Sequence, residues 1–163
     1  MTLFWGRFSY SGLLFAIGAL VIDQIHKSWM LHVFDIAEKG IVRVTPFFDL
    51  VMVWNRGISY GLFQQDSEAG RFFLVGVSIL ASLVLILVLA RSETRLSAVS
   101  LGLIIGGALG NGIDRLIYGA VADFFSLHAF GFYWYVFNIA DVAIVAGVIG
   151  LLYDLLVESR KKA

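Results

Sequence analysis

Two acids in this 163-residue sequence, Asp123 and Asp141, could do chemistry together. Asp141 stands in an apolar stretch with no basic residue within four positions, so its charge needs a partner from elsewhere in the chain. Two carboxylates that share no cation can form a general acid/base pair. One accepts a proton from water, and the other, kept neutral by its neighbour, protonates the carbonyl oxygen under attack. Such a pair titrates as one unit, and the reaction it predicts is amide hydrolysis.

Polar residues in the other apolar stretches are candidates as well, because an ionisable side chain at the centre of a membrane costs about 2.5 to 3.5 kcal/mol on insertion scales. Asp23 and Lys27 lie four positions apart, on one face of a helix. An ion pair between them is favoured over a chemical role for either residue. Lys27 could also extend its ammonium group towards the membrane surface.

A further polar group consists of Asn111, Asp114 and Arg115. Asp114 could be satisfied by hydrogen bonds at a helix end, and Arg115 could be the counter-charge that orients a carboxylate. Asn111 could bond across helices. A structural role is favoured for Asp114 and Arg115. Asp123 has a structural alternative too, as the N-cap of a helix that would start at Phe124.

The composition places these residues in a membrane protein. Hydrophobic residues make up 60% of the chain, charged residues 15%, and the mean hydropathy is +0.87, which is too apolar for a soluble domain. The 12 basic and 12 acidic residues balance, which argues against nucleic-acid binding. The sequence has no cysteine, which excludes disulfides and cysteine nucleophiles. Its three histidines lack the spacing of metal ligands, so neither metal nor cofactor is expected.

Four stretches are long enough to cross a bilayer, which takes roughly 20 apolar residues. We predict spans near 11–33, 72–90, 97–117 and 135–156. No small-residue cleavage site follows the first apolar run, which therefore predicts an uncleaved span and not a signal peptide. Because no linker or repeat divides the chain, residues 1–163 are predicted to form a single domain of an all-α membrane protein.

Basic residues beside the spans indicate the orientation, because Lys and Arg are retained on the cytoplasmic side. Basic residues are dense near both termini and in the connection between the second and third spans; they are Arg7, Arg91, Arg95, Arg160, Lys161 and Lys162. We therefore expect both termini in the cytoplasm and the segments 34–71 and 118–134 on the outer face. All the candidate polar residues then fall in the outer half of the protein, at one depth.

The two outer segments have different patterns. Residues 50–54 form a β-prone run that stops at Asn55-Arg56-Gly57, where a turn is allowed, and this predicts a small sheet on the membrane surface. The segment 118–134 is dense in aromatic side chains that suit the headgroup zone. It is predicted to be an interfacial amphipathic helix or loop.

Other functional classes fit less well. A serine/lysine peptidase needs a serine beside an unprotonated lysine, whereas Lys27 and Ser28 point to different helix faces. A proton-coupled transporter or channel needs polar residues at successive depths, and the span 72–90 offers only Ser78 and Ser82. A non-catalytic scaffold gives no reason for the two acids to lie close together.

Four blocks of the sequence resemble the lipoprotein signal peptidase family, also called signal peptidase II. They are Asp23-Gln24-Ile25-His26-Lys27; Pro46-Phe47-Phe48 with Asn55-Arg56-Gly57; Gly106-Gly107-Ala108-Leu109-Gly110-Asn111 with Asp114-Arg115; and Val121-Ala122-Asp123-Phe124 with Phe137-Asn138-Ile139-Ala140-Asp141. Four blocks in this order on a chain with four spans are highly specific. The chain departs from the family at Ile58-Ser59-Tyr60, where Ala-Ala followed by Phe or Trp is common, and this affects the expected shape of the substrate cradle.

The resemblance implies a multi-pass aspartic endopeptidase of the bacterial inner membrane, with its active site towards the extracytoplasmic face. Its substrate would be a diacylglyceryl-modified prolipoprotein, cleaved just before the lipidated cysteine, and its other partners would be membrane lipids. The resemblance also implies a metal-free monomer. By motif, the catalytic residues are Asp123 and Asp141, the substrate-binding or orienting residues are Asn55, Gly57, Asn111, Arg115 and Asn138, and the structural supports are Asp23, Lys27 and Asp114.

Overall fold

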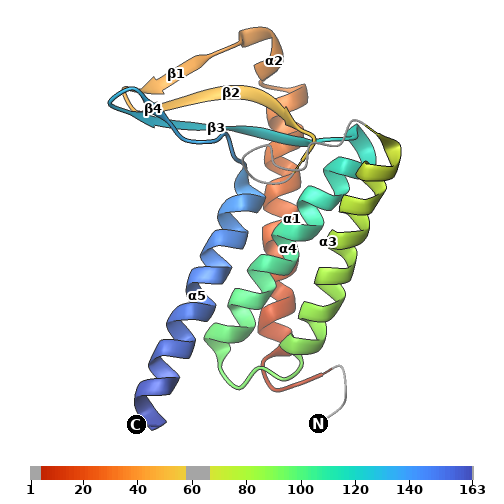
Figure 1. The fold of residues 1–163 in the computed structure, drawn as a ribbon, viewed down its shortest axis with the longest axis vertical. Coiled ribbons are helices and arrows are strands. Elements are labelled where there is room, and N and C mark those ends of the chain that lie inside the picture. The colour runs from red at the N-terminus through yellow and green to blue at the C-terminus, as the bar shows by residue number, and fades with distance from the viewer. Residues whose placement is uncertain (1–4, 58–66, 163) are drawn as a thin grey trace.

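The computed structural model describes residues 5–57 and 67–162. Four long helices and a small antiparallel sheet account for most of them (Figure 1). In chain order the elements are α1 (Ser9–His32), α2 (Ile36–Lys39), β1 (Val42–Thr45), β2 (Phe48–Asn55), α3 (Glu68–Leu89), α4 (Arg95–Tyr118), β3 (Val121–Ala129), β4 (Phe132–Tyr133) and α5 (Ile139–Lys162).

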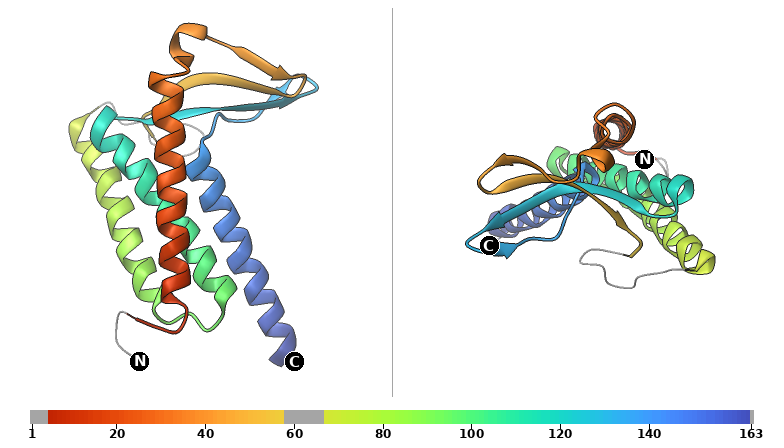
Figure 2. Two further views of the ribbon diagram at one scale, coloured as in Figure 1. Left: turned by 180° about the vertical axis from the view of Figure 1, so that it is seen from behind. Right: turned by 90° about the horizontal axis from the view of Figure 1, so that it is seen from above.

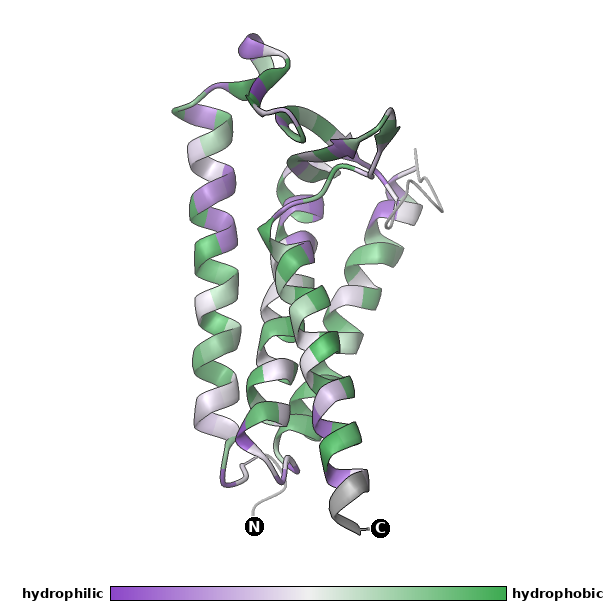
Figure 3. Cartoon of the chain, turned by 90° about the vertical axis from the view of Figure 1, so that its left-hand side faces the viewer, coloured by the Kyte–Doolittle hydropathy of each residue, from purple (hydrophilic) through white to green (hydrophobic). Residues whose placement is uncertain are grey.

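Helices α1, α3, α4 and α5 are each long and apolar enough to cross a membrane. They pack side by side, with the start of α1 and the end of α5 at the pole of the bundle opposite the sheet (Figure 1). Hydrophobic residues cover most of the helical surface, whereas hydrophilic residues gather towards the sheet (Figure 3). The predicted architecture of four membrane helices with a small sheet is therefore confirmed.

Helix α4 is the centre of the bundle and contacts α1, α3 and α5. Glycines on α4 allow this close packing. A Cβ atom on Gly102 would collide with the backbone carbonyl of Gly12 in α1, and one on Gly107 would collide with the carbonyl of Ala140 in α5. The second contact brings the backbone of α4 against the first turn of α5, where Asp141 lies.

The sheet has the strand order β1-β2-β3-β4, with antiparallel pairing throughout. It lies across the end of the bundle opposite the start of α1 and the end of α5, here called the outer pole. Its hairpin ends reach out beyond α5 (Figure 2). A small core of Met30, Ile36, Ala122 and Phe124 joins the sheet to the ends of α1 and α2. Because Asn55 pairs with Val121 and Val53 with Asp123, the end of β2 lies beside the start of β3.

The segment 118–134 differs from its prediction. It forms β3 and β4 of the same sheet, and not an interfacial helix or loop. Gly119, with φ of 78°, ends α4 and turns the chain directly into β3, whose aromatic residues suit a strand. The reading of Asp123 as a helix N-cap is therefore wrong, because Asp123 lies inside β3.

The fourth helix begins at Ile139 and not at 135. The residues just before it pair with β3, since the Trp134 amide donates to the Leu127 carbonyl at 2.8 Å and the Phe137 amide donates to the Phe125 carbonyl at 3.1 Å. Hydropathy alone extended the span into this segment, because aromatic residues score as apolar in a helix and in a strand. The other three helices lie within a few residues of their predicted ranges.

Candidate active site

Asp123 projects from β3 into a buried amide environment. The side chain is 1% exposed. Asn55, at the end of β2, donates its side-chain amide to Asp123 Oδ2 at 3.1 Å, and Asn138, just before α5, donates to Asp123 Oδ1 at 2.7 Å. Three segments far apart in the sequence therefore meet at one carboxyl group.

Asp141 lies in the first turn of α5 and forms a reciprocal cap with Asn138. The Asn138 amide nitrogen donates to Asp141 Oδ2 at 3.2 Å, and the Asp141 amide nitrogen donates to Asn138 Oδ1 at 3.0 Å. This is the arrangement of a capping box, in which an N-cap residue and the residue three positions later satisfy each other's amides. Asn111 of α4 donates to Asp141 Oδ1 at 2.9 Å, so the carboxyl group is fixed from two helices.

Asn138 is the link between the two acids. Its side-chain Nδ2 donates to Asp123, and its side-chain Oδ1 accepts from the Asp141 amide nitrogen. Within the part of the chain that the structure describes, no Lys or Arg nitrogen forms an ion pair with Asp123 or Asp141. The pair is therefore held by amides alone, as a general acid/base pair requires.

The environment shifts the acidity of Asp123. Burial, and after it the nearby charge of Asp141, raise the pKa of its carboxyl group from 3.8 to about 7. The hydrogen bonds from Asn55 and Asn138 oppose the shift, as does the charge of Lys27. Asp123 is thus mostly protonated below about pH 7 and partly protonated at neutral pH.

Lys27 lies beside this pair but is bound to two other carboxylates. Its ammonium group lies 2.9 Å from Asp23 Oδ2 and 2.8 Å from Asp114 Oδ2, and it donates to Asn111 Oδ1 at 3.0 Å. The ion pair predicted between Asp23 and Lys27 is therefore present, and it extends to Asp114. The adjacent Ser28 is exposed while Lys27 is buried against two carboxylates, so the two side chains do not lie together as the serine/lysine alternative requires.

Both acids bound to Lys27 also hold the backbone next to the candidate catalytic residues. Asp23 Oδ1 accepts from the amide of Ala140 at 2.9 Å, one residue before Asp141. Asp114 Oδ2 accepts from the amide of Ala122 at 3.1 Å, one residue before Asp123. The positions of both candidate catalytic acids are thus set by the cluster around Lys27.

Arg115 occupies a separate position near the same site. Its guanidinium group donates to the Asn111 carbonyl at 3.1 Å and to the Gly57 carbonyl at 2.6 Å. It therefore fixes the turn after β2, where Asn55 Oδ1 also accepts from the Gly57 amide at 3.0 Å. Arg115 forms no ion pair among the described residues, but its charge interacts with those of Asp123, Asp141 and Asp114, so its role as a counter-charge stays a prediction.

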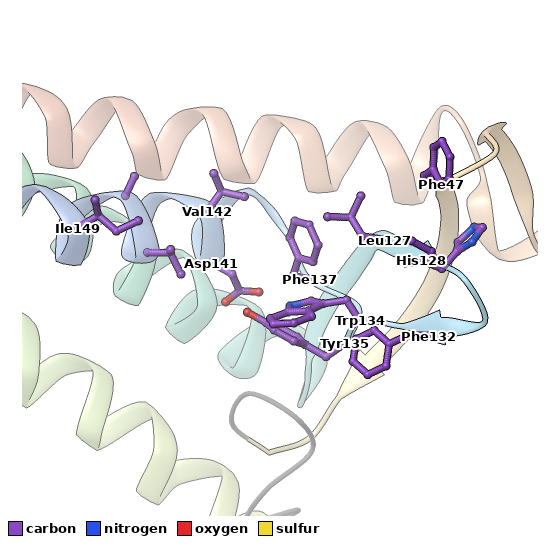
Figure 4. Close-up of a pocket in the computed structure, with 13 residues that line it drawn as sticks. Phe47, Leu127, His128, Phe132, Trp134, Tyr135, Phe137, Asp141, Val142 and Ile149 are labelled. Atoms are coloured by element: carbon purple, nitrogen blue, oxygen red, sulfur yellow. The ribbon is translucent and has the colours of Figure 1, made fainter.

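Two cavities open at Asp141. A cavity of about 730 Å³ lies between the sheet and α5, and its lining is apolar and aromatic apart from His128 and Asp141 (Figure 4). Asp141 lies in the middle of the lining, between Ile149 and the rings of Trp134 and Tyr135 (Figure 4). A smaller cavity of about 230 Å³ lies between α3, α4 and α5, and Asn55, Asn111 and Arg115 also line it.

The sequence interpretation missed two residues of this site. Tyr135 lines both cavities, and its only signal is its place close before Asn138 in the chain. Gln24 donates to Asp114 Oδ1 at 3.0 Å and to the Gly110 carbonyl at 3.2 Å, and so joins α1 to α4. Nothing in the spacing of Gln24 predicts that contact. The variable positions Ile58, Ser59 and Tyr60 lie outside the described residues.

All ten residues predicted for the site lie in one connected network near the outer pole of the bundle. Two carboxyl groups that are linked through one amide, one of them with a raised pKa, are an arrangement that general acid/base catalysis can use. No cluster of three His, Cys, Asp or Glu side chains in residues 5–57 and 67–162 is placed to hold a metal ion.

The sequence is similar to members of a known protein family. The sequence model of the family described as Signal peptidase (SPase) II matches residues 15–157. Lipoprotein signal peptidases are similar over nearly their whole length. That of Nitrobacter hamburgensis is 57% identical over 148 residues, covering 88% of this chain and 90% of the relative, and that of Rhodopseudomonas palustris is 55% identical over 150 residues, covering 90% and 92%.

Solved structures of bacterial membrane enzymes have a similar fold. A bacterial membrane enzyme determined by the in meso method at 2.3 Å resolution superposes with a TM-score of 0.82 at 26% identity, covering 100% of this chain and 97% of that chain. A second such structure, at 1.9 Å resolution, gives a TM-score of 0.76 at 26% identity, covering 96% and 98%. Together with the four apolar helices, these matches fit a multi-pass bacterial membrane protein. The chain belongs to the signal peptidase II family, whose members are peptidases.

Proposed function

We propose that this chain is an aspartic endopeptidase that removes the signal peptide from diacylglyceryl-modified prolipoproteins by cleaving just before the lipidated cysteine. Family membership supports the removal of signal peptides from prolipoproteins. The observation that carries the aspartic mechanism is the Asp123–Asn138–Asp141 arrangement, in which two carboxyl groups are linked through one amide and neither forms an ion pair with a described Lys or Arg.

The two acids take different roles. Asp141 lines both cavities, where a water molecule can reach it, and acts as the general base. Asp123 is the general acid, because its pKa of about 7 leaves a large share of the molecules protonated at neutral pH. Asp141 takes a proton from water as the water oxygen attacks the scissile carbonyl carbon, and Asp123 gives its proton to the carbonyl oxygen.

The resulting diol then collapses. Asp141 returns its proton to the leaving amine nitrogen, the carbon–nitrogen bond breaks, and one diol hydroxyl returns a proton to Asp123. The products are a signal peptide with a free carboxylate and a mature chain with a diacylglyceryl cysteine at its amino terminus. Both acids end in their starting protonation states, so neither a cofactor nor a metal enters the scheme.

The surroundings suit such a substrate. The apolar cavity beside Asp141 is large enough for an acyl chain, and its aromatic wall lies under the sheet. Asn55, Gly57 and Arg115 fix the turn that faces the smaller cavity, and we assign to them the binding of the extended segment around the scissile bond. Asn111 and Asn138 orient the two acids.

We also propose how the protein lies in the membrane. The basic residues near both termini and in the α3–α4 connection favour a cytoplasmic location for that pole. The sheet and the site then face the extracytoplasmic side of the inner membrane, where a lipid-anchored substrate would present its scissile bond. In this proposal the chain acts as one monomeric domain.

The test is cleavage of a diacylglyceryl-modified lipobox peptide by purified protein in detergent, with and without a metal chelator. Wild type and an Asp35→Asn control should cleave equally, because Asp35 is an exposed acid at the outer pole. Asp141→Asn should be inactive while keeping its thermal stability. Cleavage by Asp141→Asn at the wild-type rate, or loss of wild-type cleavage on chelation, would contradict the proposal.

A further inference from the structure

A polar cavity, separate from the two at Asp141, lies at the end of the sheet that is away from the hairpin turns. Its volume is about 400 Å³, and no residue of the candidate active site lines it. It lies where the end of β2, the start of α3 and the end of α4 meet (Figure 1). Its lining residues are Trp54, Arg56, Ser67, Glu68, Arg71, Tyr118, Gly119 and Ala120.

Charged groups of both signs line this cavity. Arg71 is held in place by a hydrogen bond from its guanidinium group to the Leu116 carbonyl at 2.6 Å. Among the described residues, neither Arg71 nor Glu68 takes part in an ion pair. Arg56 contributes a second guanidinium group to the lining. A planar guanidinium is the side chain best suited to bind a phosphate through two hydrogen bonds.

The cavity lies at the depth of the lipid headgroups. Immediately after Arg71, the rings of Phe72 and Phe73 are 55% and 68% exposed on the apolar helix α3. Ile117, beside the carbonyl that Arg71 binds, is 62% exposed. Apolar side chains exposed on membrane helices face acyl chains, so the cavity opens just above a surface that lipid tails cover.

Two aromatic rings complete the lining. Trp54 and Tyr118 lie with ring centroids 5.3 Å apart. Such rings attract a cation over their faces, and a carboxylate such as Glu68 attracts the same group. The cavity therefore offers partners for an anion and for a cation side by side, above an apolar surface.

We propose that this cavity binds a glycerophospholipid with a primary-amine headgroup. Its phosphate lies against Arg71 and Arg56, its ammonium group lies against Glu68 and the Trp54–Tyr118 rings, and its acyl chains run along Phe72 and Phe73. The exposed apolar surface favours an intact lipid over a free phosphate compound, and Glu68 favours the amine headgroup over glycerol. The proposal does not depend on the proposed function.

The experiment is native mass spectrometry of the full chain in detergent, with dioleoyl phosphatidylethanolamine or dioleoyl phosphatidylglycerol added. Wild type should bind one ethanolamine lipid at least about tenfold more tightly than Arg71→Gln, as expected for the loss of one charge-assisted pair. Glu68→Gln should lower the preference for the ethanolamine headgroup over the glycerol headgroup to near one. Arg43→Gln, an exposed arginine of β1 on the same side of the protein, is the matched control and should bind like wild type.

Free phosphoethanolamine tests whether the cavity binds an intact lipid or a free headgroup compound. It should fail to displace the bound lipid at millimolar concentration, because it lacks the acyl chains. Displacement at that concentration would show a site for the small molecule and overturn the proposal. Arg71 also donates to the Leu116 carbonyl, so Arg71→Gln removes a contact of the fold as well as a partner of the lipid. The Arg56→Gln variant therefore repeats the binding measurement at the second guanidinium group of the lining. Wild-type affinity in both arginine variants would exclude this cavity as the lipid site.

Discussion

Two pairs of aspartates lie within one hydrogen-bonded network, and they differ in whether they share a cation. Asp23 and Asp114 share the ammonium group of Lys27, at 2.9 and 2.8 Å. Asp123 and Asp141 share Asn138 and have no cation among the described residues. Asp23, Asp114 and Asp123 are all at most 1% exposed, whereas Asp141 is half-buried and lines both cavities. The shared cation and this access to a cavity are what separate a structural pair from a chemical one.

The two pairs are also connected. The structural pair accepts from the amides of Ala140 and Ala122, each adjacent in sequence to one acid of the chemical pair. A neutralised cluster can be rigid because its charges are satisfied, and it can hold the backbone of residues whose own charges must stay free to change. We therefore expect substitutions in the structural pair to lower stability and substitutions in the chemical pair to abolish cleavage.

The largest effect is expected on catalysis from Asp123→Asn. An amide cannot exchange the proton that the mechanism requires, so cleavage of the lipidated peptide should fall by about 10³-fold. The fold should persist, because asparagine can still accept from Asn138. Initial rates measured beside a thermal melt check both statements. A rate within threefold of wild type would show that Asp123 is not the acid.

The largest loss of stability is expected from Lys27→Met. The substitution leaves two buried carboxylates unpaired, and breaking a buried ion pair in this way costs about 3 to 5 kcal/mol. Yield and melting temperature in detergent should therefore drop sharply. Lys39→Met, at an exposed lysine of α2, is the control and should leave the melting temperature unchanged. Equal melting temperatures for both variants would mean that the Lys27 cluster is not a structural support.

An intermediate effect is expected from Asn138→Ala, because Asn138 touches both acids. Loss of its N-cap bonds should cost about 1 kcal/mol of stability. Misplacing the two carboxyl groups should lower the cleavage rate by about 10²-fold. The signature is a large fall in kcat with a small fall in melting temperature. A large fall in melting temperature with a nearly unchanged kcat would place Asn138 with the structural pair instead.

The smallest effect is a pH dependence that follows from Asp123. Its pKa is raised from 3.8 to about 7, so the folded state binds the proton more tightly than the unfolded state does. This contribution to stability is fully present below about pH 4 and is lost as the pH rises through about 7. The melting temperature of wild type relative to Asp123→Asn should therefore decline over that interval. A constant difference would show that the acidity of Asp123 is not shifted.

The same pKa also predicts an alkaline limb in the activity of the free enzyme. Cleavage needs protonated Asp123, so kcat/KM should fall as the pH rises above about 7. The Asp35→Asn control should give the same profile as wild type. A profile that is flat from pH 6 to 9 would contradict the assignment of Asp123 as the acid.

Much of this arrangement is predictable from local sequence. The four spans follow from hydropathy, and the Asp23–Lys27 pair follows from a spacing of four on a helix. The outer sheet follows in part from the β-prone run before Asn55. These features depend on neighbours within one element, which is why they can be seen without a structure.

The rest depends on contacts between elements. That β3 continues the outer sheet depends on its pairing with β2, and aromatic residues suit a strand as well as a membrane interface. The extension of the Lys27 cluster to Asp114, and the bonds from these acids to Ala122 and Ala140, depend on how α1, α4 and α5 pack. No spacing along the chain encodes that packing.

The most direct test of the difference between the two pairs compares Asp141→Asn with Asp114→Asn, two isosteric changes in one network. For each variant, the melting temperature and the cleavage rate per folded molecule are measured on the same preparation. Asp141→Asn is expected to melt like wild type and to lose cleavage, whereas Asp114→Asn is expected to melt several degrees lower while the folded fraction still cleaves. The reverse pattern, a stable inactive Asp114→Asn and a destabilised active Asp141→Asn, would contradict the account.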